Sequence, residues 1–365
     1  MGFQSADETA GALVVAAGGG WLRFPAPRTT IAVRRVEDVA AAFAEVCRRV
    51  EADGLWAVGY VAYEAAPGFD PALTALPPAA DGPPLLHFAL GGAPERVAGA
   101  EPPFAAGAHR LGEPVPSVEA ARYRAAIDAI HAAIERGDTY QVNHTYRLRA
   151  PFEGDPRGLF AHLVAAQGGA CGAWLDLGRH VVCCASPELF FDLEGERVTC
   201  RPMKGTARRG RWSAEDVAAA RALAASAKER AENLMIVDMM RNDLGRVAVP
   251  GSVAVPHLFA VERYPTLWQM TSTVTAETTV PLPELFAALF PCASITGAPK
   301  AATSRIIAHL EGEPRGVYTG AVGWIAPGRR ARFSVAIRTA VVDRERGEVE
   351  YGVGGGIVWD SRAER

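Results

Sequence analysis

The chain has 365 residues, of which 49% are hydrophobic and 22% charged, and its formal net charge is −3. These values are typical of a globular protein with a sizeable core, and the near-neutral charge argues against nucleic acid or an anionic membrane as the main partner. No apolar run approaches the length of a membrane span. Residues 1–15 include acidic residues and no basic stretch, so we expect no secretory signal.

The cysteines show no metal-binding or disulfide spacing, since the sequence contains no C-x-x-C pair. We expect all of them to be reduced, mostly buried thiols in a cytoplasmic protein. Two of them, Cys183 and Cys184, are adjacent and would point to opposite faces of a strand.

The first hundred residues have the pattern of an α/β region. Residues 36–50 are rich in alanine, with apolar residues at Val39, Phe43 and Val50, and predict a helix. Residues 55–62 predict a buried strand. Residues 92–116 have few large apolar side chains and no periodicity, so they are the best candidate for a linker. We therefore expect an N-terminal subdomain over residues 1–110 and a mixed α/β domain over residues 117–365.

A helix and then a strand are predicted at the start of the second domain. Ser117 can cap a helix whose apolar face runs from Tyr123 to Ile134. Gln141 and Asn143 follow at a spacing of two, so both point to one face of the strand. The two amides can satisfy a buried strand neighbour or bind a ligand, and the sequence leaves both interpretations open.

Two ionisable residues lie beside residues that shape the backbone. Glu188 follows Ser-Pro at a strand end, where burial could raise its pKa and make it a proton donor; a salt bridge is the alternative. Lys204 precedes Gly205-Thr206, and glycine lets the backbone come close to a ligand. A lysine held there can lose its proton and act as a nucleophile, whereas an isolated Lys-Gly-Thr is more often an exposed turn.

Residues 229–243 predict a helix with Glu229, Glu232 and Ile236 on one face. Paired carboxylates on a face that becomes apolar one turn later suit Mg²⁺, which keeps waters and binds through one or two carboxylates. A surface acidic pair near Lys228 and Arg230 is an equal alternative. The segment Arg241-Asn-Asp at the end of the helix is expected to form a structural network.

Residues 290–300 and 352–356 resemble nucleotide-binding loops only superficially. The first lacks the initial glycine and has Pro299 before Lys300, while too few residues follow the second for a dinucleotide fold. Thr296-Gly297 before a helix, and three glycines after a strand, could instead offer N–H groups to an anion. Arg338, expected on a strand, and Tyr318 could bind a carboxylate.

Together these segments resemble the chorismate-utilising enzymes, a family that includes the large components of anthranilate and aminodeoxychorismate synthases and the isochorismate and salicylate synthases. The resemblance runs from about Ser117 to the end of the sequence. It implies a large α+β fold with two sheets packed around the active site and helices outside. Residues 56–73 are most similar to the aminodeoxychorismate synthase branch.

Two positions distinguish the branches. Gln141 stands where the water-adding enzymes have a lysine base, which implies ammonia as the nucleophile. Lys204 stands where anthranilate synthases have alanine. The resemblance implies that Lys204 attacks C2 of chorismate as the C4 hydroxyl leaves, and that ammonia then adds at C4, giving 4-amino-4-deoxychorismate for 4-aminobenzoate and folate synthesis. A covalent lysine splits one displacement into two easier steps.

The remaining roles are implied by matching positions. Glu188 would be the general acid, and Glu232 would bind Mg²⁺ with Glu229 beside it. Residues expected to contact the enolpyruvyl carboxylate are Arg338, Tyr318, Gly354 and Gly356, and residues expected to line the site are Gly205, Thr206 and Ser294.

The resemblance also implies a separate glutamine amidotransferase subunit as the ammonia source. The sequence departs from the family at Gln269, where many relatives have histidine. It also stops before a helix that carries a second Mg²⁺ glutamate and a carboxylate-binding lysine in the family, and Glu364 lies too early to replace that glutamate. Anthranilate synthase and a non-catalytic chorismate-binding remnant are the alternative functions.

Overall fold

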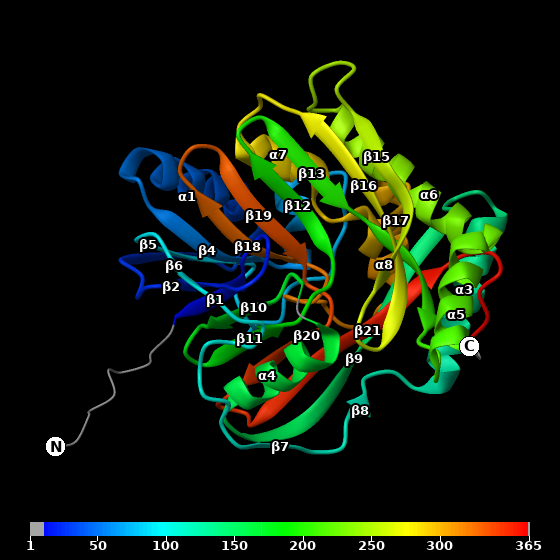
Figure 1. Cartoon of the computed structure of the whole chain (residues 1–365), viewed down its shortest axis with the longest axis horizontal. Helices are drawn as coiled ribbons and strands as arrows, with labels where there is room; N and C mark the ends of the chain where they lie inside the picture. The colour runs from blue at the N-terminus through cyan, green and yellow to red at the C-terminus, as the bar shows by residue number, and fades with distance from the viewer. Residues whose placement is uncertain (1–10, 169, 364–365) are drawn as a thin grey trace.

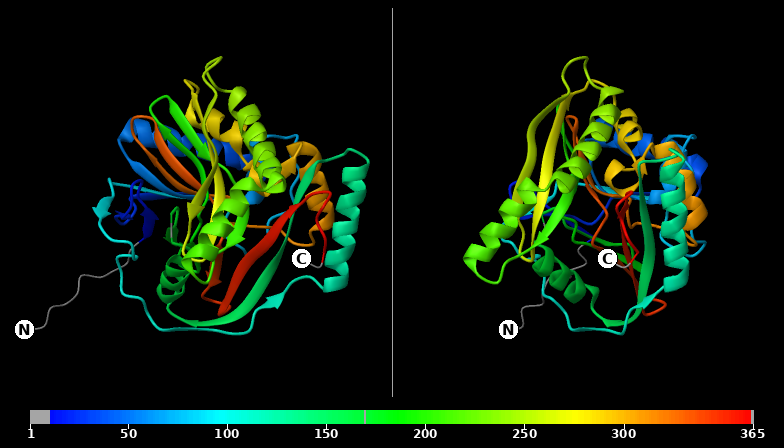
Figure 2. Two further views of the ribbon diagram at one scale, coloured as in Figure 1. Left: turned by 45° about the vertical axis from the view of Figure 1, so that its right-hand side comes forward. Right: turned by 90° about the vertical axis from the view of Figure 1, so that its right-hand side faces the viewer.

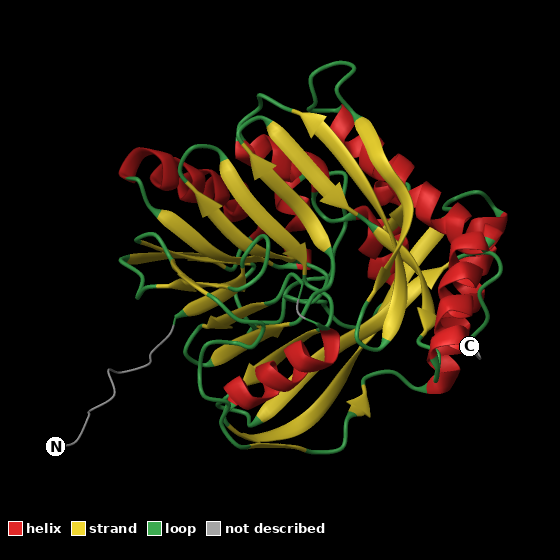
Figure 3. Cartoon of the chain, viewed as in Figure 1, coloured by secondary structure: helices red, strands yellow, loops and turns green. Residues whose placement is uncertain are grey.

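The computed structural model describes residues 11–168 and 170–363, in which two antiparallel sheets form the body of the protein and helices lie mostly outside them (Figures 1 and 3). This arrangement confirms the predicted α+β fold. The first sheet has the order β17 (Gly297–Ala298), β9 (Gln141–Gly154), β21 (Glu348–Ile357), β20 (Thr339–Asp343), β11 (His180–Cys184), β10 (Ala173–Asp176), β1 (Ala12–Val15), β2 (Trp21–Phe24) and β6 (Glu95–Val97), with β7 (His109–Leu111) and β8 (Val115–Pro116) also paired to β9.

The second sheet has β14 (Met203–Arg208), the strand that carries Lys204 and is called the lysine strand below, at one edge and N-terminal strands at the other. Its order is β14, β16 (Leu267–Glu277), β13 (Arg197–Arg201), β12 (Leu189–Glu194), β19 (Arg330–Val335), β18 (Ala321–Ala326), β4 (Trp56–Val61), β5 (Leu86–Gly91) and β3 (Thr29–Val33), and β15 (Ala254–Arg263) also pairs with β16. Segments from both ends of the chain therefore complete both sheets. The division into two domains stays a prediction.

Helices lie against the sheets on several sides of the molecule, with one group on the right-hand side of Figure 1, and Figure 2 shows the same elements in two turned views. They are α1 (Val39–Asp53), α2 (Ala66–Phe69), α3 (Ala120–Glu135), α4 (Pro156–Gln167), α5 (Ser213–Ala225), α6 (Ala227–Gly245), α7 (Leu282–Leu289) and α8 (Lys300–Leu310), with short 3₁₀ turns η1 (Val36–Asp38), η2 (Tyr63–Ala65) and η3 (Ala293–Ile295). None of the helices over the described residues combines the length and apolar character needed to cross a membrane.

The helix ends have local causes in the sequence. Asp155 caps α4 by accepting from the Arg157 amide at 2.9 Å, and Ser226 caps α6 by accepting from the Glu229 amide at 3.3 Å. Ser117 was expected to cap α3, and this prediction is wrong. Its hydroxyl accepts from the Arg147 amide of β9 at 3.0 Å, and the helix begins at Ala120.

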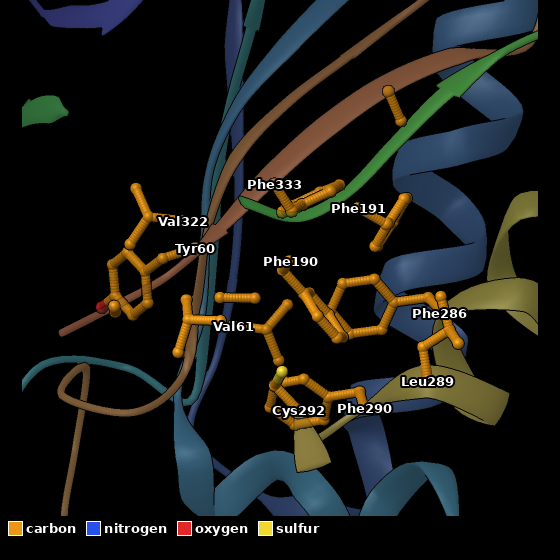
Figure 4. Close-up of a cluster of buried hydrophobic side chains, with 14 of the residues drawn as sticks. Tyr60, Val61, Phe190, Phe191, Phe286, Leu289, Phe290, Cys292, Val322 and Phe333 are labelled. Atoms are coloured by element: carbon orange, nitrogen blue, oxygen red, sulfur yellow. The ribbon is translucent and has the colours of Figure 1, made fainter. Parts of the chain in front are cut away.

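The largest apolar cluster joins the second sheet to α1, α6 and α7, and Figure 4 shows its aromatic part around Phe286 and Phe333. Their ring centroids lie 5.3 Å apart at an angle of 71°, an edge-to-face contact. A second cluster lies under α4. Cys184 packs in the first cluster and Cys183 in the second, which confirms that adjacent cysteines point to opposite faces of β11.

The prediction of free cysteines is confirmed, whereas the prediction of a linker is wrong. The cysteines are free thiols, all buried except the half-buried Cys47, as expected. The proposed linker over residues 92–116 is not structureless, because β6, β7 and β8 lie in it and pair with β2 and β9. The segment is therefore anchored along the first sheet. Residues 1–10, which formed most of the segment examined for a signal sequence, lie outside the described residues.

Candidate active site

A cavity of about 360 Å³ opens between the ends of the two sheets, within the size range of small-molecule sites. Its wall combines β14 and β16 of the second sheet, β9 and β21 of the first, η3, and the turns before β12, β18 and β20. Segments that are far apart in the sequence, from Asn143 to Gly356, therefore meet here. Most of the predicted site residues line it: Lys204, Glu188, Gly205, Thr206, Ser294, Tyr318, Arg338, Gly354 and Gly356.

The Lys204 amine reaches the end of the cavity where two glycines leave room for it. A Cβ at Gly356 would lie 2.9 Å from the Lys204 Nζ atom and 3.2 Å from the Gln141 Nε2 atom. Gly205 has φ +91°, and a Cβ there would lie 3.1 Å from the Glu229 Cβ atom. Gly205 is required by its backbone conformation, whereas a side chain at Gly356 would displace the end of the Lys204 side chain and crowd the Gln141 amide.

Glu188 is a buried carboxyl group directly before β12, and only 2% of its surface is exposed. Its Oε1 atom has no hydrogen-bond partner among the described residues. Burial raises its pKa to about 7, against the smaller opposing effects of Ser294 and the Lys204 charge. The group therefore holds a proton much more readily than an exposed glutamate.

The pKa of Lys204 shifts in the opposite direction to that of Glu188. Burial lowers its pKa below the usual value, although the carboxylates of Glu188 and Glu232 act in the opposite direction. The neutral forms of both the amine and the acid are thus favoured in one cavity. Such paired shifts are typical of catalytic acid–base groups.

Gln141 is a buried amide with an unused hydrogen-bonding capacity. Its side chain is fully enclosed, and neither its Nε2 nor its Oε1 atom has a partner among the described residues. Asn143, two residues further along β9, lines the cavity on the same side. A residue that only satisfied its strand neighbours would be hydrogen-bonded, so the geometry favours the ligand interpretation.

Tyr318 forms the wall opposite the glycines of β21. A Cβ at Gly352 would lie 2.1 Å from the Cγ atom of Tyr318, so only glycine leaves space for this ring. On another side the Arg147 guanidinium lies 5.2 Å from the ring centroid. The phenol is thus held in the wall by packing from both sides.

Two predictions about this wall are wrong. Arg338 does not lie on a strand, because it occupies the turn between β19 and β20 with φ 52°, where its exposed side chain lines the cavity. The glycines do not follow a strand either. They lie inside β21, where Gly354, Gly355 and Gly356 pair with Thr145, His144 and Asn143 of β9, so sheet pairing places them.

The segment before α8 contributes through Ser294 and Ile295, which line the cavity. The predicted anion site at Thr296-Gly297 does not form as expected. The Thr296 hydroxyl donates to the Cys292 carbonyl at 3.1 Å, and Gly297 pairs with β9. Lys300 binds Asp243 at 2.6 Å, and this buried ion pair confirms a structural network at the end of α6.

Glu229 and Glu232 lie on α6 at the border of the cavity, behind Gly205. Burial raises the pKa of Glu232, and the neighbouring charge of Glu229 adds to the effect. Lys228 approaches Glu232 only to 3.9 Å. Among the described residues no group of three or more His, Cys, Asp and Glu side chains could hold a metal. Glu364 lies outside the described residues.

Two polar residues hold the lysine strand in place: Asn233, which the sequence did not single out, and Gln269, which it singled out only as a departure from the family. Asn233, buried on α6, donates to the Lys204 carbonyl at 3.4 Å and accepts from the Ser272 hydroxyl at 2.5 Å. Gln269 donates to the Gly205 carbonyl at 2.8 Å and accepts from the Thr206 hydroxyl at 3.0 Å. A polar Asn233 directly before the apolar face of α6 is the signal that could have pointed to the first contact.

Comparison with known proteins explains this combination of groups. The profile of the chorismate binding enzymes matches residues 22–365, which is almost the whole chain. The chain belongs to this family. It is 43% identical over 237 residues to aminodeoxychorismate synthase component 1 of Salmonella typhimurium, which covers 64% of this chain and 52% of the relative. The chain therefore aligns with about half the length of that relative.

Other members of the family are also similar. The chain is 43% identical over 233 residues to anthranilate synthase component 1 of Streptomyces coelicolor, covering 62% of this chain and 45% of the relative. The structure of anthranilate synthase component I from Streptococcus pneumoniae superposes with a TM-score of 0.78 at 21% identity, over 100% of this chain and 92% of that one. This likeness shows a common fold.

Proposed function

We propose that the protein is the chorismate-aminating component of an aminodeoxychorismate synthase, which converts chorismate and ammonia to 4-amino-4-deoxychorismate and water. The observation that carries the proposal is the Lys204 amine in a cavity with the buried Glu188 carboxyl group, whose Oε1 atom has no hydrogen-bond partner among the described residues. Burial favours the neutral form of both groups. A neutral amine is a nucleophile and a neutral carboxylic acid is a proton donor.

In the first step the Lys204 nitrogen forms a bond to C2 of chorismate, both ring double bonds shift along the ring, from C1=C2 and C5=C6 to C1=C6 and C4=C5, and the C4–O bond breaks. The Glu188 carboxyl group gives its proton to the departing hydroxyl, which leaves as water. The attacking amine becomes a secondary ammonium group and keeps its protons. Because Glu188 lacks a partner for Oε1 among the described residues, it is free to reach the substrate oxygen.

In the second step ammonia forms a bond to C4, both ring double bonds shift back, and the C2–N bond breaks so that Lys204 leaves as the neutral amine. The new ammonium group at C4 gives one proton to the Glu188 carboxylate, which restores the starting forms of Lys204 and Glu188. No net oxidation occurs. Gln141 supports ammonia as the nucleophile, because its unpaired amide can bind a small neutral donor but cannot act as a base.

The substrate carries two carboxylates, and the cavity offers groups for both. Arg338 and Tyr318, with the backbone around Gly354 and Gly356, would bind the enolpyruvyl carboxylate. Glu232, with Glu229 beside it, would hold Mg²⁺ for the ring carboxylate. Two carboxylates suit this ion, which usually binds through one or two protein carboxylates and substrate oxygens. When bound, Mg²⁺ would neutralise the charge of the ring carboxylate.

The ammonia would come from a separate glutamine amidotransferase subunit. Two relatives of the chain are named as component 1 of aminodeoxychorismate synthase, which supports a partner component. The product would serve 4-aminobenzoate and folate synthesis in the cytoplasm. One observation favours a second candidate, anthranilate synthase, since a relative of that name is also 43% identical.

The test mixes the protein with chorismate, Mg²⁺ and ammonium at mildly alkaline pH and separates the products by chromatography with mass detection. An added aminodeoxychorismate lyase is the variable, and the Lys204→Ala variant is the control. Formation of 4-aminobenzoate only with the lyase supports the proposal. Formation of 2-aminobenzoate without the lyase favours anthranilate synthase. Binding of chorismate without any product favours a non-catalytic chorismate-binding protein.

A further inference from the structure

Arg315 is a buried arginine that does not line the cavity but donates hydrogen bonds to residues of the cavity wall. Only 1% of its surface is exposed, and it lies between the end of α8 and β18. Its guanidinium donates to the backbone carbonyls of Ile295 at 2.8 Å and Asn143 at 2.6 Å. A guanidinium has five N–H groups in a rigid plane, so it fixes the relative positions of its acceptors.

Both carbonyl acceptors belong to residues that line the cavity. Asn143 lies on β9 of the first sheet, two residues from Gln141, and Ile295 lies in η3 next to Ser294. The guanidinium also reaches the Thr319 hydroxyl at 3.5 Å, next to the cavity residue Tyr318. One side chain therefore connects three separate segments of the wall from behind.

The charge of Arg315 is compensated on the same side. The Glu311 carboxylate accepts from its Nε atom at 2.9 Å and from its terminal nitrogen at 2.6 Å. Glu311 also accepts from the amide and hydroxyl of Thr145 on β9 at 2.8 and 2.9 Å. On the opposite face the guanidinium lies 4.4 Å from the ring centroid of Tyr63. The buried charge is thus fully paired, as a stable buried arginine requires.

The backbone of Arg315 is fixed as well. Glu64, buried in η2 beside the second sheet, accepts from the amides of Arg315 and Gly316. The connection therefore runs from the second sheet through Glu64 and Arg315 to β9 of the first sheet. It spans the two layers between which the cavity opens.

We propose that Arg315 is the positioning residue that sets the spacing of the cavity wall, and so the affinity for chorismate, without contacting the substrate. This inference rests on chorismate binding as part of the proposed function. Its physical basis is that a misplacement of about 1 Å, caused by a change far from the reacting atoms, can cost about 100-fold in rate, and the same misplacement of groups that bind the substrate weakens binding. This one guanidinium contacts three wall segments, of which η3 and β9 are also joined by the pairing of β17 with β9 and by the Asn143 amide, which donates to the Thr296 carbonyl at 2.7 Å.

The main test is the double variant Arg315→Met/Glu311→Gln, which removes both buried charges while the glutamine oxygen can still accept from Thr145. The matched control is Arg332→Met/Asp192→Asn, which removes a partly buried ion pair of β19 and β12 away from the cavity. Calorimetric titration gives the Kd for chorismate, thermal unfolding reports the fold, and ammonium-dependent kinetics give the KM of each substrate.

We expect the double variant to fold and to bind chorismate about 100-fold more weakly, with a raised KM for chorismate and an unchanged KM for ammonium. The control keeps its wild-type Kd. A folded double variant with the wild-type Kd would overturn the inference. An equal rise of both KM values would also overturn it, since that indicates a general loss of structure.

If the double variant does not fold, Arg315→Lys decides the question. Lysine keeps the charge but has three donors on one nitrogen and cannot span the Ile295 and Asn143 carbonyls and Glu311 together. A Kd raised about tenfold in a folded Arg315→Lys protein supports the inference, and an unchanged Kd refutes it. Because Kd is measured without turnover, a wild type that binds chorismate but aminates nothing would refute the proposed reaction and leave this test valid.

Discussion

The acidic and basic groups at the cavity differ from those directly behind it in how completely they are hydrogen-bonded. Glu188 and Lys204 meet in the cavity, and Glu188 keeps an unpaired oxygen among the described residues. Glu311 and Arg315 lie behind the cavity and are saturated with partners. The two carboxyl groups are almost equally buried, at 2% and 6% exposed. The number of partners, rather than depth, therefore separates the pair that we propose to be reactive from the pair behind the cavity.

The pKa directions follow from this difference. Burial raises the pKa of Glu188 to about 7, and the nearby charges are too weak to reverse it. Burial acts on Glu311 in the same direction, but the charge and hydrogen bonds of Arg315 outweigh it and lower the pKa below the usual value. A carboxyl group that is left unpaired stays protonated near neutral pH and can donate that proton.

Removing the reactive amine should have the largest effect. We expect Lys204→Ala to lower the kcat of amination at C4 by at least about 10⁴-fold, because the nucleophile is lost. The Kd for chorismate should change by less than about tenfold, since no binding group for the carboxylates is removed. Intact-protein mass spectrometry should show a chorismate-derived adduct in the wild type and none in the variant. Wild-type amination by Lys204→Ala would contradict the covalent role.

Breaking the pair behind the cavity should also lower stability. We expect Arg315→Met to lower the free energy of unfolding at pH 7 by about 3–5 kcal/mol, because it leaves the Glu311 charge buried and unpaired. The sign of the pH dependence follows from the lowered pKa of Glu311, which stabilises the wild type above the unfolded pKa and loses that contribution in acid.

The loss caused by Arg315→Met should therefore shrink as the pH falls toward 4. Denaturant unfolding at several pH values measures it. Arg332→Met, which breaks a partly exposed pair, is the control and should cost about 1 kcal/mol or less. A loss that grew in acid would mean that Glu311 is not ionised in the native protein.

The sequence predicted the reactive pair but not the structural one, and the reason is physical. Lys204, Glu188 and the α6 carboxylates lie in short segments whose composition is unusual by itself. Arg315 acts through backbone carbonyls of Asn143 and Ile295, and no residue type at those positions signals such a contact. Long-range partners of this kind appear only when the sheets are assembled.

The same reason explains the wrong local predictions. The Ser117 side chain could cap a helix, but β9 lies beside it. The Arg147 amide of β9 donates a hydrogen bond to the Ser117 hydroxyl instead. Arg338 lies in an apolar stretch that predicts one strand, but the chain passes there from the second sheet to the first and must turn. Tertiary pairing decided both cases against local preference.

Neutralising Glu188 should separate its catalytic role from its cost in stability. Its folded pKa of about 7 lies above the usual value, so its contribution to stability is present in acid and is lost as the pH rises through 7. We expect Glu188→Gln to unfold with a free energy about 3 kcal/mol higher than the wild type at pH 8.5 and about equal to it at pH 4.

The kcat of Glu188→Gln should fall by about 10²–10⁴-fold because the general acid is lost. In the wild type kcat should decline as the pH rises above 7, and this limb should be absent from the residual activity of the variant. The control is Glu194→Gln, because Glu194 is exposed at the far end of β12, the strand that Glu188 directly precedes. If Glu188→Gln were less stable at pH 8.5, the native carboxyl group would have to be paired.

The smallest expected effect concerns the link between the two acidic residues of α6 and the lysine strand. Asn233 follows Glu232 directly and donates to the Lys204 carbonyl, so it couples the helix to the strand. We expect Asn233→Ala to lower the free energy of unfolding by about 1–2 kcal/mol, because the Ser272 hydroxyl loses its buried acceptor.

The kcat of Asn233→Ala should fall about tenfold with little change in the Kd for chorismate, because the nucleophile moves while the carboxylate-binding wall stays in place. Asn242→Ala, an exposed residue of the same helix, should change neither quantity. A rise in Kd equal to the fall in kcat/KM would instead assign Asn233 to the binding wall. Under that outcome the Asn233 contacts and the Arg315 contacts would both set substrate affinity. The contrast drawn above would then hold only for the ionisable groups, Glu188 with Lys204 and Glu311 with Arg315.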